Sequence, residues 1–132
     1  MELEEHIKGV RLAAESVSNK AGEIILKRAL LTETEIKRNS TSRPGPISRS
    51  GEHRRAWTTT AFAKRGEVGA VIGNTVPYAM RLEFGFAGPD SLGRVYNQPP
   101  YPAAGPAMQL AQPLLKKELL DGLGIEPVGT IG

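Results

Sequence analysis

A repeating apolar seam near the N-terminus constrains the fold of this chain more than any other feature. Apolar residues recur at spacings of three and four, at Leu3, Ile7, Val10, Ala14, Val17, Ala21 and Ile24. This period predicts one long amphipathic helix over residues 3–31. The small residues Ala14 and Ala21 leave room for close packing. Two partners fit this seam: a sheet of the same domain, or a neighbouring subunit.

Two further segments carry regular patterns. Residues 58–73 alternate in polarity on either side of a Lys-Arg-Gly-Glu turn, which predicts a β-hairpin with Gly66 at positive φ. Residues 103–123 carry an apolar stripe typical of a second helix. Pro113 lies inside that stripe, and we expect it to bend the helix rather than end it, because the stripe continues on both sides.

These elements predict one α+β domain over residues 1–123. Its parts are a long N-terminal helix, a small antiparallel β-sheet, a long loop, and a C-terminal helix packed on the sheet. A length of 132 residues fits a single domain with its own core. Residues 124–132 are punctuated by glycine and proline, which predicts an extended C-terminal tail.

Positive charge is concentrated in residues 37–56, which we interpret as a basic loop around Pro44-Gly45-Pro46. Four of its arginines are candidate DNA-channel residues: Arg43, Arg49, Arg54 and Arg55. A solvated surface is the alternative interpretation. Contact with phosphates would be independent of base sequence, because the segment offers no recognition helix and no platform of aromatic side chains.

The stretch from 75 to 101 has an unusual order of features. Pro77 suits the first turn of a short helix, Gly85 suits its end, and Pro99-Pro100 predicts a rigid extended return. Between them, 85–101 is predicted to be a long interface loop, with Val95–Asn97 as an optional edge strand. The loop carries Phe86, Leu92, Val95 and Tyr96, which are too apolar for a fully solvated segment.

Residue types needed for catalysis or metal binding are sparse. The chain has no cysteine, and its two histidines, His6 and His53, have no partner at ligand spacing. Glu83 has no evident partner for general-base catalysis, so a salt bridge with Arg81, Arg94 or a neighbouring subunit is the favoured interpretation. We therefore expect no catalytic site, no metal and no cofactor. We also expect no membrane span and no secretory signal.

Two short motifs resemble the neck and tail-completion proteins that join head to tail in long-tailed siphophages. One is Tyr78-Ala79-x-x-x-Glu83-Phe84-Gly85, which is followed by the proline-rich return and the C-terminal helix. The other is Ser50-Gly51-x-x-Arg54-x-x-Trp57, where His53 replaces the family's leucine and Trp57 its small residue. Together the resemblance covers about half of the chain, from residue 50 to about residue 120.

The resemblance implies a structural virion protein of the neck or tail end, assembled in the host cytoplasm. Its copies would close a ring, with a hexamer favoured and a dodecamer possible, around a lumen that passes DNA. Other neck proteins and the tail tube protein would be its partners. A basic protein that binds nucleic acid without sequence preference is the alternative. The candidate subunit-interface residues are Tyr78, Glu83, Phe84, Phe86, Leu92, Val95, Tyr96, Pro100 and Tyr101.

Overall fold

One long helix forms the spine of the molecule. A computed structural model describes residues 2–47, 49–64, 66–89 and 91–125, with the backbone alone at 2–3, 9–14 and 96. In it, α1 spans Glu2–Asn39 and continues past the predicted end at residue 31. The extension enters the segment that we predicted as a basic loop, so that boundary was wrong.

Polar contacts at helical spacing explain this extension. The hydroxyl of Thr32 donates to the carbonyl of Arg28 at 2.8 Å. Ion pairs join Lys37 to Glu33 and Arg38 to Glu35 at spacings of four and three. Such pairs stabilise a helix without any apolar period, which is the only signal that the sequence prediction followed.

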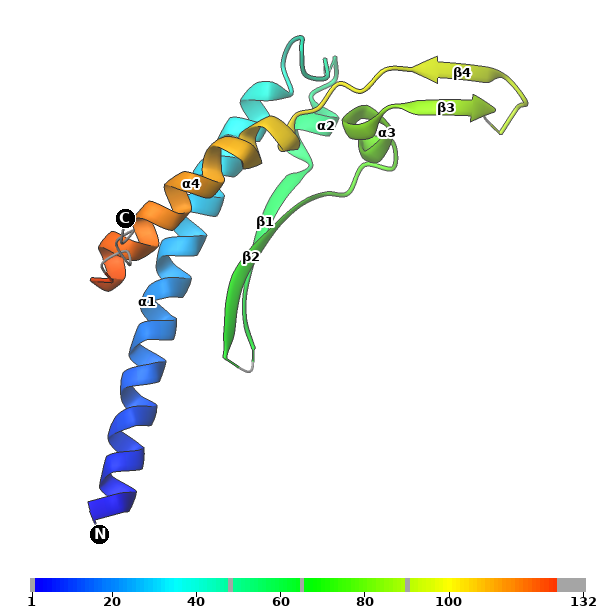
Figure 1. Ribbon diagram of the computed structural model, residues 1–132. Coiled ribbons are helices and arrows are strands. Elements are labelled where there is room, and N and C mark those ends of the chain that lie inside the picture. Colours follow the sequence, from blue (N-terminus) through cyan, green and yellow to red (C-terminus); the bar gives the residue numbers. More distant parts are fainter. Residues whose placement is uncertain (1, 48, 65, 90, 126–132) are drawn as a thin grey trace, which may run out of the picture.

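The predicted hairpin is confirmed. β1 (Trp57–Lys64) pairs antiparallel with β2 (Glu67–Asn74), and Gly66 lies in the turn with φ 81°. The two strands run beside α1 (Figure 1). On the face away from α1, the ring of Phe62 covers its cross-strand partner Gly69, where an added Cβ would lie 2.5 Å from the ring.

The C-terminal helix α4 (Ala104–Leu123) lies antiparallel along α1 (Figure 1). Asn39 near the end of α1 donates to the carbonyl of Ala103, and Arg28 pairs with Glu118 at 2.6 Å. The helix continues through Pro113, as predicted, and the bend there stays a prediction. It ends at Gly124 with φ 67°. The predicted tail beyond residue 125 lies outside the described residues.

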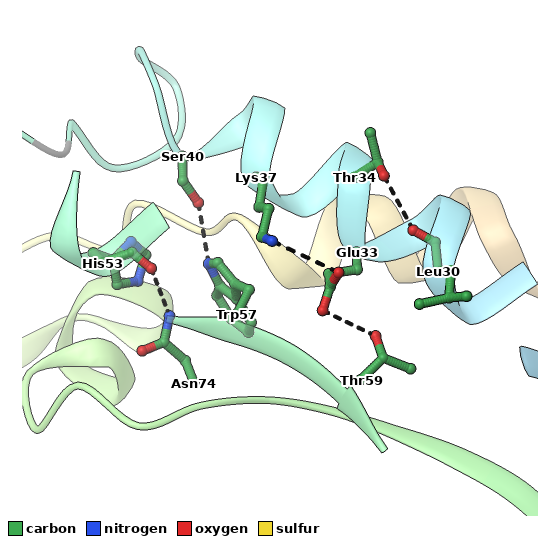
Figure 2. A network of polar contacts seen from close by, with 9 residues as sticks. All are labelled: Leu30, Glu33, Thr34, Lys37, Ser40, His53, Trp57, Thr59 and Asn74. Atoms are coloured by element: carbon green, nitrogen blue, oxygen red, sulfur yellow. Dashed lines mark hydrogen bonds and ion pairs between the residues drawn. The ribbon is translucent and has the colours of Figure 1, made fainter. Parts of the chain in front are cut away.

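The core lies where α1, the hairpin and α4 meet. Its buried apolar residues are Ile36, Trp57, Ala103 and Ala107, with Ile72 packed against them. The indole of Trp57 donates to Ser40, while Glu33 accepts from Thr59 on the hairpin (Figure 2). These contacts hold the C-terminal half of α1 against the sheet.

The segment predicted as a long loop forms a second hairpin instead. The short helices α2 (Glu52–Arg55) and α3 (Ala79–Phe84) precede it. β3 (Phe86–Pro89) then pairs antiparallel with β4 (Val95–Gln98), and this hairpin, which we call the arm, projects away from α1 and α4 (Figure 1). Glycine and proline suggested irregular backbone, but so short a ladder tolerates Pro89 at the end of its strand.

The α+β class is therefore confirmed, with two separate two-stranded sheets rather than one sheet and a loop. The predicted strand near 95–97 exists, but it pairs with β3 instead of extending the first hairpin. No helix among the described residues is long and apolar enough to span a membrane.

Candidate subunit interface

Glu83 fixes the start of α4. Its Oε1 accepts hydrogen bonds from the backbone nitrogens of Ala103 and Ala104, and its Oε2 accepts one from Gly105, each at 2.9 Å. Ala103 at the N-cap position has no capping side chain of its own. A carboxylate at this place satisfies unpaired N–H groups and suits the positive end of the helix dipole. The contacts described for Glu83 are therefore those of a helix cap, and the expected salt bridge with Arg81, Arg94 or a neighbouring subunit stays a prediction.

The base of the arm is tied to α3 by backbone contacts. The nitrogen of Tyr101 donates to the carbonyl of Leu82 at 2.6 Å, and Gln98 donates from its side chain to the carbonyl of Arg81. Gly85 turns the chain from α3 into the arm with φ 79°. A Cβ there would lie 2.9 Å from the oxygen of Gln98. The direction of the arm is thus set by a crowded junction that accepts only glycine.

The two faces of the arm differ in chemistry. The half-buried ring of Phe86 lies under the guanidinium of Arg81, which is 3.9 Å from the ring centroid. Alternate residues of the ladder, Ala87, Pro89 and Val95, share the opposite face and are exposed. Val95 is 82% exposed. The fourth residue of this outer face is the exposed Asn97, the cross-strand partner of Ala87, so the face is uncharged and mostly apolar, with one amide.

Apolar exposure continues onto α3 beside the arm. Met80 and Phe84 are 73% and 74% exposed, and Leu92 at the arm tip is 75% exposed. Side chains of this size are rarely left so open in clusters on soluble proteins. Among the described large apolar residues, the four that are more than 70% exposed thus lie on α3 and the arm, while less exposed ones are spread over α1, the first hairpin and α4.

His53 is the least expected residue near this junction. Sequence analysis placed it in a loop, yet it lies on α2 at 3% exposure, between the rings of Trp57 and Tyr78. Its Nδ1 has no partner among the described residues. Burial lowers the pKa of His53 below its ordinary value, although the nearby Glu83 carboxylate acts in the opposite direction.

Tyr78 connects the two short helices. Its hydroxyl lies 3.4 Å from Oε2 of Glu52, and its ring is 42% exposed. Partial burial and the Glu52 carboxylate raise the pKa of Tyr78 above its ordinary value. Asn74 adds a second tie, because its amide donates to the carbonyl of His53 and accepts from Val76 (Figure 2 shows the first contact).

The candidate DNA-channel arginines divide into two pairs. Arg43 stacks on the ring of Tyr101 at 3.5 Å and donates to Gly45, while Arg55 donates to the carbonyl of Ser50. All four arginines are exposed. Lys37 and Arg38, also counted in the basic segment, pair with carboxylates on α1. These two ion pairs leave less unpaired positive charge in the segment than the sequence suggested.

The structure gathers most of the predicted interface residues around one junction. Tyr78, Glu83, Phe84, Phe86 and Tyr101 surround the base of the arm. Leu92 and Val95 lie farther out along it, Pro100 is exposed at its return, and the side chain of Tyr96 lies outside the described residues.

Sequence analysis missed some exposed apolar residues. Met80 on α3 and Val71 on the hairpin, 58% exposed, are examples. Neither 86–89 (Phe-Ala-Gly-Pro) nor 95–98 (Val-Tyr-Asn-Gln) alternates in polarity, so the sequence carried little strand signal for the arm.

The whole chain exposes more surface than its size predicts. A folded protein of 14.2 kDa exposes about 6,800 Å² by the usual scaling, whereas this chain exposes 9958 Å². The excess is roughly 3,000 Å², and a standard interface buries about 800 Å² per partner. The described residues contain no group of three or more potential metal ligands.

Comparison with protein-family models, with curated proteins and with solved structures finds no protein similar to this chain.

Proposed function

We propose that this protein is a structural component of a phage neck or tail end that assembles as a closed ring. The observation that supports this most is the arm, a short projecting hairpin with exposed apolar residues on its outer face and at its tip. A projecting element of that kind is costly in a monomer, because its apolar surface stays in water. Contact with another subunit would remove the cost.

The excess surface is large enough for the two patches that a ring requires of each subunit. Each subunit of a ring uses two different patches, one for each neighbour, whereas a symmetric dimer uses one patch. Two standard patches account for about 1,600 Å² per subunit, which lies within the roughly 3,000 Å² of excess. The motif resemblance supplies the biological setting of the ring at the head–tail junction.

The unpaired part of α1 fits the same proposal. Near its C-terminal end α4 lies against Ile24 of α1, whose side chain would meet a Cβ added at Gly122. The N-terminal part of α1 extends beyond the other elements (Figure 1). Ile7 and Val17 of the predicted seam are 48% and 53% exposed there. A neighbouring subunit or neck protein would cover this stretch.

Replacing residues 86–98 with a short Gly-Ser linker tests the proposal. Phe86 and Gln98 are cross-strand partners, so the linker has little distance to close. We expect a folded monomer by circular dichroism that forms no ring by native mass spectrometry or negative-stain microscopy. In a phage carrying the change, heads and tails should accumulate unjoined.

A second variant separates the length of the arm from its chemistry. The double substitution Leu92→Ser and Val95→Ser keeps the backbone of the arm and removes its two most exposed apolar side chains. We expect weakened ring formation with an unchanged melting temperature.

Full assembly and infectivity of the linker variant would rule out a role of the arm in joining.

Nucleic-acid binding is the second candidate, favoured by the exposure of Arg49 and Arg54. If they contact phosphates, the slope of log affinity against log salt falls by about one for each arginine removed. Lys116→Gln with Lys117→Gln, two exposed cations on α4, is the matched control. An equal change of slope in both variants would mean a diffuse charge effect without a site.

A further inference from the structure

An apolar groove lies between α1, β2 and α4. Its volume is about 220 Å³, and its walls include Ile25, Ala29, Ile72, Met108 and Leu115. For comparison, a cavity of about 150 Å³ lined by aliphatic side chains accommodates benzene. The groove is therefore large enough for an apolar side chain from another segment.

The charged group at the groove is already paired. Arg28 donates to Glu118 at 2.6 Å, and this hydrogen bond lowers the pKa of Glu118. Thr32 donates its hydroxyl to the carbonyl of Arg28. With these polar groups satisfied within the chain, the groove favours an uncharged apolar ligand over an ion or a phosphate.

The outer face of the arm has the matching chemistry. Ala87, Pro89 and Val95 share an uncharged, mostly apolar face with Asn97, and the exposed Leu92 lies at the tip of the arm. The arm's own base is tied to α3 through Tyr101 and Leu82, and the arm points away from α1 and α4 (Figure 1). An arm held in that direction cannot enter the groove of its own chain.

We infer that the groove between α1, β2 and α4 receives the arm of a second copy of this chain, with Leu92 or Val95 as the inserted side chain. The inference rests on the proposed ring and names the surface on which the arm docks. Arm and groove are different patches of one chain, so the contact is head-to-tail and every copy uses both patches. The excess accessible surface is large enough for both patches, the arm and the groove.

Cysteine cross-linking tests this contact, because the natural chain contains no cysteine. A Leu92→Cys chain is mixed with a Met108→Cys chain under mild oxidation, and the disulfide-linked dimer is measured on a non-reducing gel. Leu110→Cys replaces Met108→Cys in the control, because it lies on the same helix and is more exposed, at 66% against 42%. Random collision would therefore favour the control pair.

We expect the 92–108 pair to link at least about tenfold faster than the 92–110 pair, because docking raises the effective concentration of the two sulfur atoms. Adding Val95→Asp to the Leu92→Cys chain should abolish the difference. Adding Val71→Asp, which places the same charge on the exposed face of β2, should preserve it.

Three results would overturn the inference. Equal linking rates in a protein that still forms rings would mean that another segment or another neck protein occupies the groove, and the proposed function would survive. A Leu92→Cys, Met108→Cys chain that links only within itself would mean that the groove receives its own arm. Absence of both rings and dimers at all concentrations would count against the proposed function as well.

Discussion

Oε1 of Glu83 lies 2.9 Å from the backbone nitrogen of Ala103, the N-cap of a helix that begins twenty-one residues later in the chain. The same oxygen accepts from Ala104, and Oε2 accepts from Gly105. The carboxylate of Glu83 thus joins α3, which precedes the arm in the chain, to α4, which follows it. The geometry of the arm depends on this cap.

Replacing Glu83 with alanine should lower the free energy of unfolding by about 2 kcal/mol, because three N–H groups lose a charged acceptor. Glu83→Gln keeps one acceptor oxygen and should lose less. Urea unfolding measures both changes, and Glu67→Ala on the exposed edge of β2 is the control, expected within about 0.5 kcal/mol of the natural chain. Equal effects at Glu83 and Glu67 would contradict the capping role.

Gly85→Ala and Gly93→Ala form a matched pair, because both glycines have φ 79°. A Cβ at Gly85 would meet the oxygen of Gln98 at 2.9 Å, whereas at Gly93 nothing lies within 4 Å. Both variants carry a backbone cost of about 1–2 kcal/mol, and only Gly85→Ala adds a steric cost. Unfolding in urea should therefore rank Gly85→Ala as the less stable; the reverse order would mean that the junction yields easily.

His53 should make stability depend on pH. Its pKa is lowered in the folded state by burial, so between that value and the ordinary value of about 6.5 the unfolded chain binds more protons. Stability is then fully present above about pH 6.5 and is lost as pH falls below it. We expect a loss of stability between pH 7.5 and 5.5 that does not exceed about 1.4 kcal/mol, the linkage limit for one proton over the pH unit below 6.5.

The source of that loss can be isolated by two substitutions. His53→Leu should remove the dependence and raise stability at pH 5.5, since leucine leaves no unpaired polar atom in the core. His6→Gln, on the exposed part of α1, should leave it unchanged. If urea unfolding gives the same pH profile for all three chains, carboxylates rather than His53 are responsible.

The four arginines should differ in their effect on folding. Arg43→Gln removes a guanidinium stacked on Tyr101 and should cost about 0.5–1 kcal/mol. Arg54→Gln, at an exposed site, should change stability by less than about 0.5 kcal/mol. Thermal unfolding of the two single variants gives the comparison. A larger loss for Arg54 would show that it has a structural role which its exposure conceals.

Patterns local in sequence were enough to predict much of the fold. Strict periods of 3.6 and 2 depend on neighbours a few residues away, so the two long helices and the first hairpin followed from them. The turn at Gly66 and the helix end at Gly124 follow from glycine's freedom at positive φ. The chemistry of the 75–101 stretch also pointed to an exposed apolar surface.

Tertiary structure alone decided the rest, because the relevant contacts join residues far apart in the chain. The cap by Glu83 of a helix at residue 104 leaves no periodic signal, and neither does the burial of His53 between Trp57 and Tyr78. The arm became a hairpin because its base is fixed by Tyr101 and Leu82, which overrides the weak strand propensity of glycine and proline. The secondary-structure preference of a single residue is worth tenths of a kcal/mol. Contacts that fix the base of the arm outweigh it.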